Sequence, residues 1–318
     1  MSDIPTRVQI NEEGPREGFQ FEKGAIPTAR KIELIDSLSE TGINHIQVAS
    51  FVNPNLVPGW ADAEEVVARY KRKPGVDYTA LWLNLKGLQR AMATGRLDIA
   101  GSFSLTASET FLKRNQKRSF ADNIRAAHDT IRMYRDNAIP LERAGIMAAF
   151  GCNFEGEIPH QRVLDMIQTL LDIAAEHGMA PRVFSLADTM AWASPKSVRA
   201  LVGKVRDRYP DLTLSLHLHD TRGMGIANAY AGLEMGVAIY DATVAGLGGC
   251  PFAAHKGAAG NVCTEDLVFM LDEMGIETGI DLDALIETAR LAEDIVGHPL
   301  PGSVKMGGSL KALRATLN

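Results

Sequence analysis

Short apolar, β-branched runs alternate with longer stretches of helical period along this chain. The predicted strands span residues 7–11, 43–51, 78–83, 98–105, 143–151, 182–189, 212–220 and 240–247. Apolar positions recur with helical period over 29–42, 61–73, 119–137, 161–178, 194–210, 225–236, 264–275 and 281–297, and several of these stretches end at a glycine. Strands and helices in this alternation predict an α/β fold, a (β/α)8 TIM barrel with additional C-terminal helices.

The domain organisation follows from the same pattern. An open, doubly wound sheet is the alternative, but no G-x-G-x-x-G motif follows the first strand. No internal repeat or low-complexity linker interrupts the chain. We therefore predict a single domain over residues 1–318, with a barrel core at about 7–275 and a helical extension at about 276–318.

Composition excludes several classes of function. The formal net charge is −6 and acidic and basic residues are interspersed, which argues against a nucleic-acid partner. Cys152, Cys250 and Cys263 have neither metal-site spacing nor an even disulfide count, which favours a reducing compartment. No apolar run approaches the ~20 residues that cross a bilayer, so we expect no membrane association and a cytoplasmic location.

The stretch "TLSLHLHDT" at 213–221 is the first chemical signal. Because side chains of a strand alternate between faces, Leu214, Leu216 and Leu218 share one face and leave His217 and His219 on the other. In a barrel the leucines would face the helices, and the histidines would line the interior near the carboxyl end of the strand. Two satisfied core histidines are the alternative, but the H-x-H spacing favours a metal site.

Two further segments follow predicted strands. The first strand leads into "NEEGPREGFQFEKG", where Arg16 and Glu17 lie in a predicted Gly-Pro turn. The last strand leads into the glycine-rich segment "AGLGGCPFAAHKGAAGN", which ends at Asn261. Because barrel active sites form at the carboxyl ends of strands, both segments are candidates for the site. A surface ion pair between Arg16 and Glu17 is the alternative, but their position at the end of a predicted barrel strand argues against it.

A family resemblance follows from motifs in order along residues 7–295. These motifs are "EEGPREGFQFEK", "SFVNPNLVP", "NLKGL", "TASETFLKRN", "GCNFEGEI", "SLADT", "HLHDTRGMGIANAYAGLEMGV" and "DATVAGLGGCPFA…GAAGNVCTEDLVFML". The chain resembles the 3-hydroxy-3-methylglutaryl-CoA lyases, metal-dependent barrel lyases related to Claisen-type synthases. The resemblance implies a carbon–carbon lyase that acts on an acyl-CoA substrate, and a homodimer.

The resemblance also implies roles for individual residues. Glu17, His217, His219 and Asn261 would hold a divalent cation, and oxygen and imidazole ligands suit Mg²⁺ or Mn²⁺. Arg16 would stabilise a thioester enolate. The loop cysteine Cys250 would transfer a proton, with an inert small residue as the alternative. Asp188 is the third candidate catalytic residue and would support the site. The acid and the base stay open among Cys250, Asp188, His217 and a metal-bound water. The positions expected to contact substrate or coenzyme A are Lys23, Gln47, Ser50, Asn115 and Thr189.

The chain departs from the family pattern at three places. The family's ligating acid is normally aspartate, where this chain has Glu17. Strand 2 usually carries glutamate, where this chain has Gln47, which hydrogen-bonds but cannot act as a base. We interpret Gln47 as a lining residue that bonds Arg16 or a water. The glycine-rich loop is longer through His255 and Lys256, which are solvent-exposed or reach the substrate.

These observations leave several functions open. The leading hypothesis is retro-Claisen cleavage of a 3-hydroxyacyl-CoA, by default 3-hydroxy-3-methylglutaryl-CoA, to acetyl-CoA and acetoacetate. Gln47 and the longer loop favour a lyase for another substrate such as citramalyl-CoA. A condensing synthase and a non-catalytic CoA-ester binder are the remaining alternatives.

Overall fold

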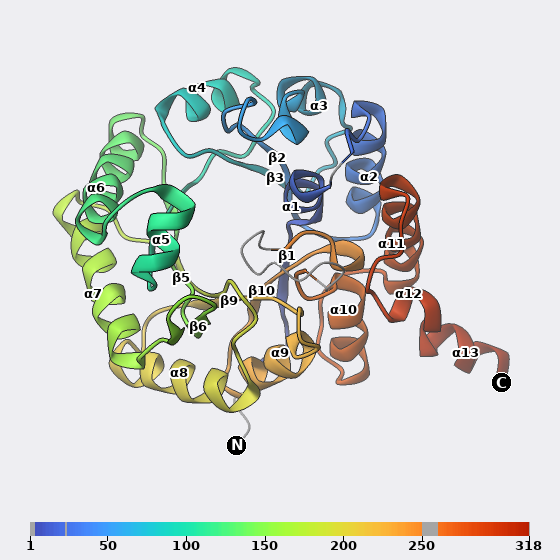
Figure 1. Ribbon diagram of the computed structural model, residues 1–318. Helices are drawn as coiled ribbons and strands as arrows, with labels where there is room; N and C mark the ends of the chain where they lie inside the picture. The colour runs from blue at the N-terminus through green and yellow to red at the C-terminus, as the bar shows by residue number, and fades with distance from the viewer. Residues whose placement is uncertain (1–3, 23, 250–259, 318) are drawn as a thin grey trace. The chain divides into compact units, whose positions relative to one another are not determined.

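Parallel strands alternate with helices, as the sequence predicts, and the alternation can be followed by colour in Figure 1. The computed structural model describes residues 4–22, 24–249 and 260–317. The strands of the main sheet are β1 (Gln9–Glu12), β2 (His45–Ser50), β3 (Asp77–Leu81), β4 (Gly101–Thr106), β5 (Leu141–Met147), β8 (Val183–Asp188), β9 (Leu214–Leu218) and β10 (Ile239–Ala242). Their order in the sheet is β3-β2-β1-β10-β9-β8-β5-β4. This is the strand–helix alternation of a TIM barrel, and the predicted fold class is confirmed.

The helices predicted from periodicity are present within a few residues. They are α2 (Thr28–Glu40), α3 (Ala63–Arg69), α6 (Phe120–Asp136), α7 (His160–Glu176), α8 (Pro195–Arg208), α9 (Gly225–Glu234), α10 (Thr264–Glu273) and α11 (Leu282–Val296). The predicted C-terminal extension contains the two short helices α12 (Val304–Gly307) and α13 (Leu310–Leu317). None of the helices in the described ranges is long and apolar enough to cross a membrane.

Other elements were not predicted. They are α1 (Gly14–Phe21), α4 (Leu85–Ala93), α5 (Glu109–Gln116), the 3₁₀ turns η1 (Pro58–Trp60) and η2 (Val244–Gly246), and the hairpin of β6 (Gly151–Cys152) and β7 (Gly156–Glu157). The predicted strand at 240–247 was too long, because the chain leaves β10 after Ala242 and turns through η2. The described residues divide into two compact units, which we describe separately.

The first unit, mainly residues 100–240, contains β4, β5, β8 and β9 as parallel neighbours. Leu216 and Leu218 of β9 are fully buried. A Cβ atom on Gly232 of α9 would lie 2.5 Å from Cδ1 of Leu216, so helix and strand pack at close range there. This contact agrees with the predicted leucine face of β9 toward a helix, and it leaves the alternate positions of the strand for chemistry.

The second unit comprises residues 6–99, 241–249 and 260–317 among those described. Its strand β2 pairs in parallel with both β1 and β3. The β2–β3 register shifts between Gln47 and Ala49, which is a β-bulge. Bulges re-aim neighbouring side chains and are frequent beside active sites. The bulge therefore lies beside a residue that the sequence placed in the candidate site.

Candidate active site

Helix α1 carries Arg16 and Glu17 directly after β1. We predicted a turn here, but Pro15 occupies the first turn of a regular helix, where its missing N–H has no partner to lose. The Arg16 carbonyl, still within α1, accepts a hydrogen bond from the indole nitrogen of Trp60 at 2.9 Å. This hydrogen bond fixes the backbone of α1 at the residue that carries the guanidinium.

The Arg16 guanidinium is bound on three sides. Its Nε donates to Oε1 of Gln47, so the expected bond between these residues is present. Its two terminal nitrogens donate to Glu17 at 3.0 Å and to Glu13 at 2.6 Å. Burial lowers the pKa of Arg16, but the charges of Glu17 and Glu13 raise the pKa by more, to above its ordinary value. The side chain is a fixed cation, suited to stabilise an anion.

Asn261 is paired with Glu17. The amide nitrogen of Asn261 donates to Oε2 of Glu17 and to the carbonyl of Leu247 at 3.3 Å. Within the described residues the buried Oδ1 of Asn261 has no hydrogen-bond partner. A buried carbonyl oxygen without a donor is costly unless something else satisfies it. A cation would do so, and the Glu17 carboxylate beside it would supply negative charge.

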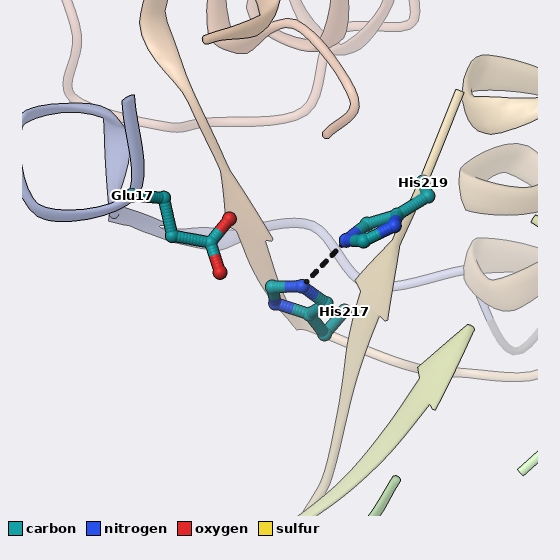
Figure 2. Close-up of side chains that lie close together, drawn as sticks. All are labelled: Glu17, His217 and His219. Atoms are coloured by element: carbon teal, nitrogen blue, oxygen red, sulfur yellow. Dashed lines mark hydrogen bonds between the residues drawn. The ribbon is translucent and has the colours of Figure 1, made fainter. Parts of the chain in front are cut away.

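His217 and His219 form the second candidate feature, on β9. Their Nε2 atoms face one another at 3.2 Å (Figure 2). Two nitrogens bound at right angles to one metal, each at ~2.1 Å, would be roughly 3.0 Å apart. His219 is buried, and His217 is aligned in the sheet with the small Ala187 of β8. At 3.2 Å the two rings share a hydrogen bond, and their nitrogens are also close enough to bind one metal ion, so metal binding stays the prediction for this pair.

Asp188 and Thr189, at the end of β8, bind backbone. The Asp188 carboxylate accepts from the amides of Trp192 at 2.7 Å and Ala193 at 3.0 Å, and Oγ1 of Thr189 accepts from the amide of Ala148 at 2.9 Å. Burial raises the pKa of Asp188 to about 6, although those two amides oppose the rise. These contacts make the pair a support for the loops around it, and the catalytic role of Asp188 and the substrate contact of Thr189 stay predictions.

The remaining predicted residues are distributed unevenly. Ser50 is fully buried at the end of β2, and its hydroxyl has no partner among the described residues. Asn115 is exposed on α5. Cys152 and Cys263 are buried free thiols. The predictions for Lys23, Cys250, His255 and Lys256 lie outside the described residues.

Sequence reasoning missed two acids, Glu12 and Glu13. Glu12 is fully buried and accepts hydrogen bonds from the amides of Gly14 at 2.7 Å and Val244 at 2.9 Å and from the hydroxyl of Thr264 at 2.5 Å. Burial raises the pKa of Glu12 to about 8 against these bonds. The signal for both acids was their position, because charged residues between the first strand and Gly-Pro lie where barrel sites form.

The fold and these side chains define a class of protein, the TIM-barrel enzymes that place charged and imidazole groups at the ends of their strands. A model of one family matches residues 7–292 and is described as HMGL-like. The chain belongs to the HMGL-like family.

Relatives agree over most of the chain. The chain is 41% identical over 285 residues to the mitochondrial hydroxymethylglutaryl-CoA lyase of Gallus gallus, an alignment that covers 90% of this chain and 92% of that protein. The structure of the Bacillus subtilis HMG-CoA lyase is similar with a TM-score of 0.85 and 35% identity, covering 94% of this chain and 97% of that one. An HMG-CoA lyase from Acinetobacter baumannii, in complex with coenzyme A and 3-methylmalate, has a TM-score of 0.84 and 36% identity over 96% of each chain.

Proposed function

We propose that this protein is a divalent-metal-dependent lyase that cleaves the C2–C3 bond of a 3-hydroxyacyl-CoA. With 3-hydroxy-3-methylglutaryl-CoA as the default substrate, the products are acetyl-CoA and acetoacetate. The observation that carries the proposal is the linked set of Arg16, Glu17 and Asn261, which joins a fixed cation to a carboxylate and an unsatisfied amide oxygen. The named relatives support the same class of reaction.

The proposed ligands of the cation are Glu17, Asn261, His217 and His219. Their carboxylate, amide and imidazole donors suit Mg²⁺ or Mn²⁺. When bound, such an ion supplies Lewis-acid polarisation of substrate oxygens. The replacement of aspartate by glutamate at position 17 keeps the donor chemistry.

The reaction requires three groups: a base, a cation that stabilises the enolate, and an acid. A base removes the 3-hydroxyl proton, the C2–C3 bond breaks, and its electron pair moves onto the thioester as an enolate. Arg16 stabilises that negative charge, which exists only as the bond breaks, and so lowers the barrier. Cys250 then protonates C2 to give acetyl-CoA. Asp188 and Thr189 hold the surrounding loops.

The contacts proposed for the substrate are spread over several elements. Lys23 and Asn115 bind coenzyme A, and Gln47 and Ser50 line the acyl site. The coenzyme A complex of the Acinetobacter baumannii relative supports an acyl-CoA as the substrate class. Residues 1–318 act as one cytoplasmic catalytic domain in this proposal, and the functional assembly is a homodimer.

A second candidate is cleavage of a different 3-hydroxyacyl-CoA such as citramalyl-CoA. Gln47 favours it, because a neutral amide stands against Arg16 where related lyases carry a glutamate. A synthase running the condensation and a non-catalytic CoA-ester binder are the alternatives that the same experiment distinguishes.

One mass-spectrometric assay tests the proposal. Purified protein is incubated with 3-hydroxy-3-methylglutaryl-CoA or citramalyl-CoA, with Mn²⁺ or with EDTA. We expect acetyl-CoA to appear in the samples with Mn²⁺ and not in those with EDTA. The substrate that is cleaved faster shows which acyl group the enzyme prefers. In a parallel reaction, the protein is incubated with acetyl-CoA and a keto acid. Net formation of the condensed 3-hydroxyacyl-CoA would indicate a synthase. No turnover in either direction would contradict the proposed activity.

A further inference from the structure

The N-cap residue of α1 does not cap its helix. Glu13 occupies that position, where an acidic side chain normally accepts a hydrogen bond from the first turn of backbone amides. Its carboxylate makes no such bond. It accepts instead from Nη2 of Arg16 at 2.6 Å. Glu13 therefore does not stabilise the helix as a cap, and its carboxylate binds the guanidinium of Arg16.

Glu13 is itself held firmly. Its residue is 6% exposed, and its backbone amide donates to the carbonyl of Ala242 at 2.9 Å. A buried carboxylate on an anchored backbone has little freedom to leave its partner. The Glu13–Arg16 pair therefore differs from a surface ion pair, in which two mobile side chains meet in water.

The pattern of bonds leaves part of Arg16 free for substrate. A guanidinium has five N–H groups, and the contacts of Arg16 with Gln47, Glu17 and Glu13 use three of them, one on each nitrogen. Among the described residues, the second N–H of each terminal nitrogen has no bonded partner, which leaves these two donors for the thioester oxygen as the enolate forms. The three fixed contacts determine the plane of the group and hence the direction of those two donors.

We infer that Glu13 is a positioning residue for Arg16, holding the guanidinium in the orientation that stabilises the enolate; this inference rests on the proposed function. Because Gln47 is neutral, Glu13 supplies a negative charge to Arg16 in addition to that of Glu17. Glu13 thus balances the cation while Glu17 shares its other oxygen with Asn261.

The test uses Glu13→Gln, which removes the charge and keeps the size of the side chain. We expect kcat to fall about 10- to 100-fold, since misplacement of a catalytic group by ~1 Å has effects of that order. KM and the Mn²⁺ affinity measured by electron paramagnetic resonance should change by less than about threefold, because Arg16 acts on charge that exists only as the bond breaks and no proposed metal ligand is replaced. Wild-type kcat in this variant would overturn the inference.

A relocated charge provides the rescue. In the double variant Glu13→Gln with Gln47→Glu, a carboxylate returns to Arg16 through the side chain that already bonds its Nε. We expect kcat to recover at least about tenfold over Glu13→Gln alone. A purely structural role of Glu13 would not be repaired from strand β2, so absence of recovery contradicts a positioning role.

Two measurements complete the design. Glu287→Gln breaks an Arg–Glu pair with the same spacing, Glu287 with Arg290, on the surface of α11, and it should leave kcat unchanged.

The Nε–H signal of Arg16, identified by its loss in Arg16→Lys, reports guanidinium mobility by ¹⁵N NMR without any substrate. Increased mobility in Glu13→Gln supports the inference even if the wild type cleaves no acyl-CoA, which would count against the proposed function alone. Unchanged mobility of the Arg16 guanidinium in Glu13→Gln would overturn the inference that Glu13 positions it.

Discussion

His219 shows how much chemistry a single position on a strand can specify. Its imidazole is buried, and its Nε2 lies 3.2 Å from that of His217. Alternation along the strand predicted this pair from the sequence, because three leucines fixed the other face. No comparable pattern distinguishes Glu12 from Glu13, since two adjacent acids before a glycine are equally compatible with solvent. Both are buried, and the contacts that distinguish them involve residues remote in the sequence, since Glu12 accepts from Val244 and Thr264, more than 200 positions away.

Replacement of His219 tests the proposed metal site. His219→Ala removes one of two converging nitrogen donors, so we expect Mn²⁺ binding to weaken by at least about 100-fold and turnover to be abolished. Equilibrium dialysis with metal analysis measures the first effect. His45→Ala, which removes a strand histidine bonded to Thr79, serves as the control and should bind Mn²⁺ normally. Metal-replete, fully active His219→Ala protein would exclude this residue as a ligand.

Glu12 should make stability depend on pH. Its pKa is raised from 4.5 to about 8 by burial, so between these values the folded protein binds a proton that the unfolded chain has released. The free energy of unfolding therefore falls as pH rises through this window, by an amount on the order of 2–4 kcal/mol. Glu12→Gln, which resembles the protonated acid, should flatten the fall. Urea unfolding at pH 5 and pH 8.5 measures it, and identical pH dependence in both proteins would contradict the assignment.

At the scale of elements, helix α1 shows where sequence patterns stop being sufficient. Gly14, Pro15 and Gly18 disfavour a helix by intrinsic propensity, and we therefore predicted a turn. Pro15 costs nothing in the first turn, and Gly18 is required by packing, because a Cβ atom there would lie 2.9 Å from Cβ of Leu247. That contact joins segments far apart in sequence. Helices with regular apolar spacing, by contrast, were predicted from local pattern alone.

At Gly248, in the segment after β10, an added methyl group should disturb the proposed metal ligands. Gly248 has φ +84°, and a Cβ atom there would lie 2.9 Å from Cβ of Glu17 and 3.1 Å from the amide nitrogen of Asn261. Gly248→Ala should separate these two ligands and weaken Mn²⁺ binding by about tenfold or more. Gly275→Ala, with φ +71° and open space around it, controls for backbone strain. Both variants should lose stability, but equal Mn²⁺ affinity in the two would contradict the prediction.

For the whole molecule, the sequence was sufficient to predict the fold class. Eight apolar segments separated by amphipathic helices of ordinary length leave few alternatives to a parallel α/β architecture. The family followed from motifs spread over the entire chain. Side-chain partners could not be predicted in the same way, because a hydrogen bond such as that of Arg16 with Gln47 depends on the register of β2 and on its bulge.

Metal binding should stabilise the chain as a whole. A ligand that binds the folded state alone raises the free energy of unfolding by about 2.7 kcal/mol when present at 100 times its Kd. Mn²⁺ should therefore raise the Tm of the wild-type protein, and EDTA should reverse the increase. In His219→Ala the same Mn²⁺ concentration should have a much smaller effect, at most about 0.4 kcal/mol if binding is about 100-fold weaker. An equal increase in both proteins would mean that the ion binds elsewhere.

Trp60 gives the molecule an internal optical reporter. Its indole is completely buried and is tied to the backbone of Arg16. The chain has two other tryptophans, Trp82 and Trp192, and the indole of Trp192 donates to Asn153. With those two replaced by phenylalanine, emission at short wavelength should come from Trp60 alone. A movement of α1 when a cation or an acyl-CoA binds would then appear as a change in fluorescence intensity, so that each binding step could be timed by stopped-flow mixing.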